Sequence, residues 1–190
     1  MSFDDTRYFL LLLQAFGLEP LRPGNDPNGW TLRALFTPTF HADCCLTLVG
    51  DGAQAAIEWI VLAPGARSAV MHEMGFRGFA PLPGAAAAPK IELHEVTEVR
   101  EGPLASFMTV VAAVDPYSLP TGESLGVDGM SVQCESQRGS LVHGFRTWSP
   151  SHRSDPVHHR YLMALLALAK ESLGEPRSHR AIAEVCTYLR

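Results

Sequence analysis

Histidine and cysteine are the residue types in this sequence with the most obvious chemical potential. There are eight histidines and four cysteines, and His41, Asp43, Cys44 and Cys45 form the densest group of potential metal ligands. Zinc accepts all of these side chains, but a structural site usually draws its ligands from two such groups at defined spacing. The sequence offers this one group. We interpret it as a loop histidine, a turn aspartate and two packed thiols, and we predict neither a metal nor another cofactor.

Two His-Glu pairs are candidates for acid–base chemistry. His72-Glu73 lies in a segment rich in glycine and proline, which predicts a loop, and loops often carry binding residues. His94-Glu95 lies on a predicted polar strand. Successive side chains on a strand point to opposite faces of the sheet, so we expect His94 and Glu95 not to form a dyad.

Two further histidines could act near a pocket. His143 could face Cys134 or Glu135 across a hairpin, and a Cys–His pair is the basis of many nucleophilic sites. His158 begins a predicted helix, where a solvated position is the simpler interpretation and a neutral histidine at a pocket rim is the alternative. We predict no catalytic residue. The pocket or interface candidates are six residues: His72, Glu73, His94, His143, Trp148 and His158.

Common catalytic and nucleotide-binding motifs are missing from the sequence. It contains neither GxxxxGK nor GxGxxG, and no HExxH, which argues against the commonest nucleotide-binding and metalloprotease classes. Residues 122–126 match GxSxG in residue type, but they lie in a predicted loop and not at the strand-to-helix turn that a nucleophile elbow requires. The net charge is -5 and the pI is about 5.9, whereas binding to nucleic acid or anionic lipid favours a basic surface. We therefore expect no nucleic-acid partner and no membrane partner.

Length and composition predict a single globular domain. The 190 residues are 46% hydrophobic and 18% charged, which is the balance of a chain that buries its own core. Asp4 and Asp5 stand where a signal peptide would carry positive charge, and no apolar run approaches the roughly 20 residues of a membrane span. We predict one soluble, cytoplasmic domain over residues 1–190.

Hydrophobic spacing predicts the elements that position these residues. Residues 9–16 form an apolar helical face that ends before Gly17. Leu10 and Leu11 widen this face, so the helix is either well covered or pairs with a second copy of the chain. Alternation and turn signals predict about seven strands, over residues 30–37, 44–49, 53–62, 90–99, 104–114, 130–135 and 141–148.

Turn residues organise the predicted strands into hairpins. The three turns are Gly50-Asp51-Gly52, Arg100-Glu101-Gly102-Pro103 and Gln137-Arg138-Gly139. Residues 63–89 are predicted to be a long loop because glycine and proline interrupt them throughout. A loop of this length is often functional.

Two helices are predicted after the last strand. Asp155-Pro156 is a typical helix start and Gly174 ends that helix, while Ser178 is predicted to cap a final helix. Strands in hairpin order, without βαβ alternation, predict an α+β fold. We expect a mostly antiparallel sheet of about seven strands, with one N-terminal helix and two C-terminal helices packed on one face.

Residues 128–173 resemble the C-terminal half of many small bacterial proteins. They combine Asp128-Gly129, a hairpin, Trp148-Ser149-Pro150 and an apolar helix that starts with proline. Some of these proteins are immunity proteins, which neutralise polymorphic toxins. The resemblance implies a protein partner, with a basic toxin as its most concrete form, but no particular binding residue.

Three functional hypotheses follow. The leading one is a non-enzymatic protein-binding domain of the immunity type. The second is a small enzyme or ligand-binding domain that uses histidines at a pocket between sheet and helices. The third is a structural protein that forms a homodimer through its first helix. Convergence of three or more of the candidate histidines in one concave site would favour the second hypothesis over the first.

Overall fold

Six strands form one antiparallel sheet in the computed structural model, which describes residues 5–52, 54–75, 89–122, 126 and 128–189. Their order across the sheet is β4-β3-β2-β1-β5-β6. The strands are β1 (Gly29–Pro38), β2 (Cys44–Asp51), β3 (Gln54–Leu62), β4 (Ile91–Glu98), β5 (Met130–Arg138) and β6 (Leu141–Trp148). The α+β class is confirmed, whereas the predicted strand count of about seven is wrong by one.

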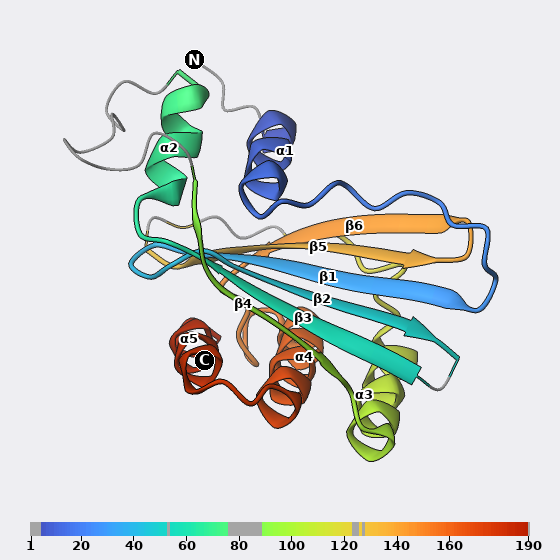
Figure 1. Ribbon diagram of the computed structural model, residues 1–190. Helices are drawn as coiled ribbons and strands as arrows, with labels where there is room; N and C mark the ends of the chain where they lie inside the picture. The colour runs from blue at the N-terminus through green and yellow to red at the C-terminus, as the bar shows by residue number, and fades with distance from the viewer. Residues whose placement is uncertain (1–4, 53, 76–88, 123–125, 127, 190) are drawn as a thin grey trace.

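Helices cover both faces of this sheet, which corrects the expectation that they pack on one face. One face carries α1 (Asp5–Ala15) and α2 (Ala66–Glu73). The opposite face carries α3 (Glu101–Val114), α4 (Pro156–Ser172) and α5 (Pro176–Cys186), as Figure 1 shows. The sheet therefore lies between two helical layers of unequal size.

The larger core lies between the sheet and the layer of α3, α4 and α5. Alternate residues of the strands point into it, and among them Leu32 of β1 and Trp59 of β3 are fully buried. From α4, Tyr161 and Leu165 are also fully buried. The apolar face of α4 meets the sheet over most of the length of the helix, so this layer provides most of the hydrophobic stabilisation.

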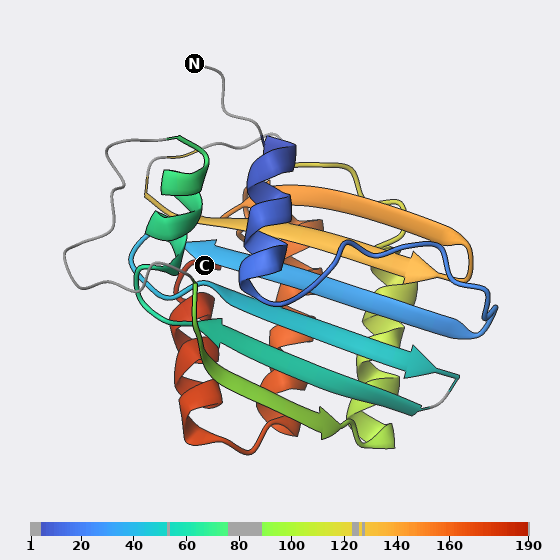
Figure 2. The same ribbon diagram turned by 45° about the horizontal axis from the view of Figure 1, so that its top comes forward.

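A smaller core lies under α1 on the other face. Leu12 and Leu13 of α1 and Phe16 directly after it are each at most 2% exposed, and they pack with Leu35 of β1 and Ile60 of β3. Figure 2 shows α1 crossing above the strands. The apolar spacing of the predicted first helix is thus explained by contacts within the chain.

Two predicted segments have a different structure. Residues 104–114, predicted as a strand, belong to α3, where Leu104, Phe107 and Val111 are buried at helical spacing. Their β-branched and aromatic residues favour a strand locally, but burial on one helical face decides the conformation. The predicted hairpin at Arg100-Glu101-Gly102-Pro103 is therefore wrong as well.

The predicted loop over residues 63–89 contains a helix. Ala66 and Val70 of α2 are buried, and Met74 follows them at the same four-residue spacing. Pro64 and Gly65 precede the helix and do not interrupt it. Residues 76–88 of this predicted loop lie outside the described residues.

The remaining elements agree with the sequence patterns. The first and third predicted hairpins are formed by β2–β3 and β5–β6, and α4 begins at Pro156 as predicted. The last helix begins at Pro176, so Ser178 lies inside α5 and not at its cap. Within the described residues, no helix combines the length and the apolarity that crossing a bilayer requires.

Candidate binding cavity

A cavity of about 920 Å³ opens between α1, α2 and the sheet face beneath them. It is lined by Tyr8 of α1, Phe40 and Asp43 of the loop between β1 and β2, Arg67 of α2 and Trp148 of β6. Residues near the end of β1, the start of β5 and the end of β6 also line the cavity.

An ion pair between Asp43 and Arg67 forms one wall. Asp43 is 4% exposed, and Arg67 donates to both of its carboxylate oxygens from Nε, at 3.1 and 3.3 Å, and to one of them from Nη2. Arg67 Nη2 also donates to the Pro38 carbonyl at 2.7 Å. Burial raises the pKa of Asp43, and the charge and hydrogen bonds of Arg67 offset part of this rise. The pair fixes the start of α2 against the loop between β1 and β2.

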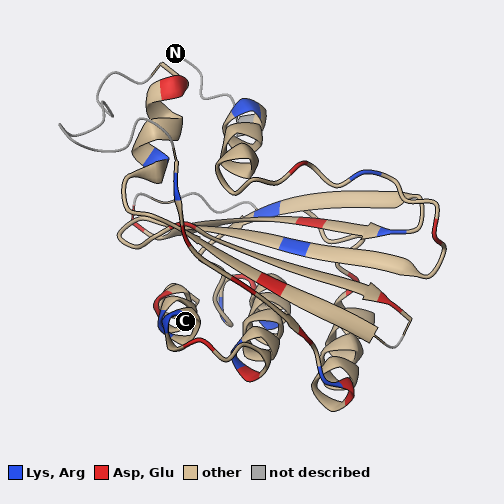
Figure 3. Cartoon of the chain, in the orientation of Figure 1, with Lys and Arg blue, Asp and Glu red and all other residues tan. Residues whose placement is uncertain are grey.

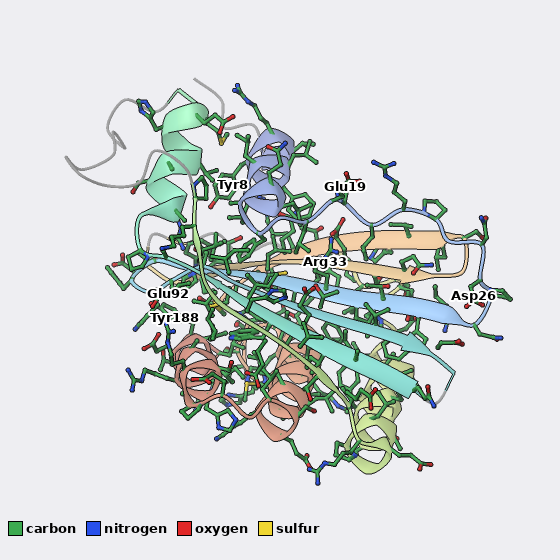
Figure 4. The ribbon with its side chains drawn as sticks, in the orientation of Figure 1. Tyr8, Glu19, Asp26, Arg33, Glu92 and Tyr188 are labelled. Atoms are coloured by element: carbon green, nitrogen blue, oxygen red, sulfur yellow. The ribbon has the colours of Figure 1, made fainter. Side chains whose placement is uncertain are left out.

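Tyr8 lies beside this ion pair. Burial raises the pKa of Tyr8 to about 12, with a smaller contribution from the Asp43 carboxylate that Arg67 partly opposes. The phenol is therefore neutral at physiological pH. Figure 4 labels Tyr8 on α1, above the sheet.

The mouth of the cavity carries an exposed aromatic ring. Phe40 lines the cavity and is 72% exposed. Its backbone N–H donates to the Tyr188 hydroxyl at 3.3 Å, and the same hydroxyl lies 2.8 Å from His41 Nδ1. The rings of His41 and Tyr188 meet edge to face, with centroids 5.6 Å apart. The segment after α5 thus holds the loop that presents Phe40.

The floor of the cavity is polar. Thr37 of β1 pairs with Ser131 of β5, and its hydroxyl donates to the Ser131 carbonyl at 3.1 Å. Gln133 pairs with Arg146 of β6, and both line the cavity. These hydroxyl, amide and guanidinium groups make the floor polar, whereas aromatic residues such as Phe40 and Trp148 make other parts of the lining apolar.

Trp148 closes the floor and requires glycine beside it. A Cβ atom at Gly126 would lie 2.3 Å from Trp148 Nε1, and one at Gly129 would lie 2.8 Å from the same atom. These distances are shorter than any normal contact, so the two glycines allow the backbone to pass close to the indole. Of the six residues predicted as pocket or interface candidates, Trp148 lines this cavity.

The two predicted His-Glu pairs lie away from the cavity. His72 and Glu73 are exposed at the C-terminal end of α2. His94 Nε2 lies 2.8 Å from the Glu58 carboxylate on the neighbouring strand, whereas Glu95 binds the start of α5. The expectation that His94 and Glu95 do not form a dyad is confirmed.

His143 and His158 both bind the connection between α3 and β5. Nε2 of His143 lies 2.7 Å from the Leu119 carbonyl, and Nε2 of His158 lies 2.8 Å from the Pro120 carbonyl. Carbonyl oxygens only accept, so both histidines donate from Nε2. His158 is 4% exposed and its Nδ1 lies 2.6 Å from Asp155, which corrects the interpretation of a solvated helix start.

The predicted neighbours of His143 also lie elsewhere. The register of β5 and β6 places Ser136 opposite His143, and Phe145 opposite Cys134. Cys134 is buried, and burial raises the pKa of its thiol well above the ordinary value. A thiol that resists ionisation is a packing group and not an activated nucleophile.

The residues of the group His41–Cys45 point in different directions. His41 binds Tyr188 and Asp43 binds Arg67. Cys44 packs in the larger core and Cys45 in the smaller core, and burial raises the pKa of both thiols. Among the residues that the structure describes, no three histidine, cysteine, aspartate or glutamate side chains gather closely enough to hold a metal ion.

A second buried ion pair anchors the connection that follows α1. Arg33 of β1 donates from Nη1 to Glu135 of β5 at 3.0 Å and to the Glu19 carbonyl at 2.7 Å. Glu135 also accepts from the Leu21 N–H at 3.2 Å. Figure 4 labels Arg33 and Glu19 on this side of the sheet. Burial raises the pKa of Glu135 and Arg33 opposes that rise, so the pair stabilises the connection beside the cavity.

Sequence reasoning missed most residues of the cavity. Phe40, Arg67 and Tyr8 come from three separate segments and belong to no motif. Phe40 gave no clear signal, because single exposed apolar residues are common on protein surfaces. Tyr8 and Arg67 gave no signal either, since arginine is common in this chain and residues 63–89 were predicted to be a loop.

Comparisons with known proteins place no further constraint on the cavity. The chain matches no protein-family model, and no curated protein sequence matches it significantly. The function is therefore argued from the geometry of the cavity.

Proposed function

We propose that this chain is a non-enzymatic protein-binding domain and that the cavity beside α1 and α2 receives a segment of its partner. The observation that carries the proposal is Phe40, which is 72% exposed at the mouth of a cavity of about 920 Å³. An aromatic side chain exposed beside a partly apolar hollow is typical of interface anchors. The loop that carries Phe40 is held by Tyr188, so the ring is presented by an ordered support.

The positions of the histidines support binding over acid–base chemistry. His143 and His158 hold a backbone connection, His94 pairs with Glu58, and His72 is exposed on α2. Of the histidines in the described residues, His41 lines the cavity. The candidate histidines are thus distributed over several parts of the fold, which is the arrangement that favours the first hypothesis over a histidine-based enzyme.

A small ligand is the second candidate occupant. A cavity of about 920 Å³ falls within the range of small-molecule sites, which is roughly 300–1,000 Å³. Native mass spectrometry of the purified chain, with and without chelator, tests this candidate. A stoichiometric bound mass would favour a small ligand, and a bare chain would favour the protein partner.

The identity of the partner stays a prediction from the sequence. Net charge of -5 favours a basic partner, because complementary charge speeds association. Figure 3 shows acidic and basic residues interspersed over the helices and the sheet. Attraction of a basic partner would therefore come from the net charge of the whole molecule. Neutralisation of a basic toxin is the most concrete form of this prediction, and homodimer formation is a further one.

Substitution of the exposed ring tests the proposed function. Phe40→Ser should remove the anchor without affecting the core, and we expect partner affinity to fall at least tenfold. Leu141→Ser is the matched control, because Leu141 is 47% exposed on β6 and does not line the cavity. The partner would be purified with the wild-type chain, identified, and titrated against both variants by calorimetry. Equal affinity of the partner for Phe40→Ser and the wild type would reject the proposal.

A further inference from the structure

One guanidinium nitrogen of Arg67, Nη1, finds no hydrogen-bond acceptor among the described residues. The other two, Nε and Nη2, donate to Asp43 and to the Pro38 carbonyl. An arginine carries five N–H donors, two of them on Nη1. The side chain is 29% exposed and lines the cavity. Its guanidinium is therefore held in a fixed orientation with donors left for a ligand.

The backbone around Arg67 adds to the same preference. Gly65, Arg67 and Ser68 line the cavity at the start of α2, and Gly65 provides no side-chain cap. The first N–H of this helix, that of Ala66, donates to the Ala63 carbonyl at 3.2 Å, and the N-terminal end of a helix favours negative charge. The start of α2 and the Arg67 guanidinium lie at the same wall of the cavity, and each favours a negatively charged acceptor there.

Apolar side chains lie around this wall. Phe40, Met71 and Trp148 line the cavity together with Arg67. A ligand that meets all of them needs a negatively charged acceptor next to a large apolar group. Asp43 is already bonded to Arg67 within the chain, so the ligand must supply an acceptor for the donors on Nη1.

We propose that the cavity recognises a carboxylate with a large apolar side chain beside it, carried by a segment of the protein partner. This inference rests on the proposed function and specifies its ligand. The carboxylate binds at Arg67 and the apolar side chain packs against Phe40 and Trp148. The carboxylate belongs either to the C-terminal residue of the partner or to an acidic side chain, and matched peptides distinguish these two sources.

The test compares acids with their neutral counterparts. The first pair is N-acetyl-phenylalanine and its amide, and the second is N-acetyl-Asp-Phe-amide and N-acetyl-Asn-Phe-amide. Each is titrated into isotope-labelled protein and followed by NMR, with binding expected on the order of 1 mM. We expect at least one acid to bind about tenfold more tightly than its counterpart and to shift resonances of residues that line the cavity. If neither acid binds more tightly than its own neutral counterpart, the inference is overturned. It is also overturned if the acids shift only resonances of residues outside the cavity.

Arg67→Lys tests the role of the guanidinium. Lysine keeps a positive charge opposite Asp43 but lacks the planar fork, so the preference for the acid should fall at least fivefold. Arg138→Lys is the control, because Arg138 lies over the Tyr117 ring, 4.4 Å from its centroid, and does not line the cavity. The wild-type comparison needs no variant and stands even if Arg67→Lys fails to fold. A partner that needs Phe40 but binds Arg67→Lys with unchanged affinity would reject this inference and leave the proposed function intact.

Discussion

At the residue scale, Glu95 of β4 caps the start of α5 from a neighbouring element. Its carboxylate accepts from the N–H groups of Gly174 and Glu175, at 2.7 and 3.1 Å, and from the Ser178 hydroxyl. Partial burial favours the protonated form, but these hydrogen bonds and the nearby His179 outweigh it and lower the pKa of Glu95 below its ordinary value. The charged carboxylate therefore stabilises the folded state.

This arrangement predicts a pH-dependent loss of stability. The folded pKa lies below the unfolded value, so the stabilisation is fully present above the ordinary pKa of about 4.5 and is lost as the pH falls through the folded value. Glu95→Gln should lower the free energy of unfolding at pH 7 by about 1–2 kcal/mol, as for a lost helix cap. The difference in free energy of unfolding between the variant and the wild type should shrink as the pH falls from about 5 to about 3, because the wild-type carboxylate becomes protonated over this range.

Urea unfolding of both proteins across this range measures the effect. Glu92→Gln is the matched control on the same strand, because Glu92 is exposed and pairs with Arg177 at the surface. Surface ion pairs contribute about 0–1 kcal/mol. A Glu95→Gln difference that stays constant from pH 7 to pH 3 would contradict the capping role.

At the element scale, α1 belongs to the core of the chain and not only to its surface. Leu12 is 2% exposed and Leu10 is 43% exposed on the same helix. Leu12→Asp places a charge in the smaller core, and we expect it to lower the free energy of unfolding by about 4 kcal/mol or more. Leu10→Asp should change it by less than about 0.5–1 kcal/mol. Circular dichroism with size-exclusion chromatography measures folding and association together.

The two variants also separate core from interface. A folded but dissociated Leu12→Asp protein would show that α1 pairs with a second copy. Dissociation by Leu10→Asp, with the fold intact, would place a subunit contact on the exposed side of the helix.

The elements also show how far the sequence could predict the fold. The strands of β1 and of the β2–β3 and β5–β6 hairpins were predictable, because alternation and tight turns are local signals. The conformation of α3 was not, because Phe107 and Val111 fit a strand equally well in composition. Buried residues at Leu104, Phe107 and Val111 have helical spacing, and this periodicity was the signal that could have decided it.

The cavity was less predictable than the fold. Its walls come from α1, the loop between β1 and β2, α2 and β6, which only the tertiary structure brings together. Residue types made His143 and His158 pocket or interface candidates, and the fold uses both to hold a backbone connection. Trp148 was one of the six predicted pocket or interface candidates, and it lines the cavity.

At the scale of the whole molecule, the two helical layers have different roles. The layer of α3, α4 and α5 covers the larger core, while α1 and α2 cover the other face and leave the cavity beside them. In the proposed function, the net charge of -5 would act on the approach of a partner over long distances, and Phe40 and Arg67 would act at contact. A partner with net positive charge could still insert one segment that carries a carboxylate and an apolar side chain. Such a partner would suit both the net charge of the chain and the residues of the cavity.

Site-specific photo-crosslinking tests the central claim most directly. A benzophenone amino acid replaces Phe40 in one protein and Leu141 in another, both are irradiated in cells that carry the chain naturally, and mass spectrometry maps each product. We expect position 40 to crosslink to one defined segment of a single protein and position 141 not to do so. We also expect the chain and this protein to form a stoichiometric complex when purified. Equal crosslinking at both positions, or a partner reached only from position 141, would contradict the assignment of the cavity as the binding site.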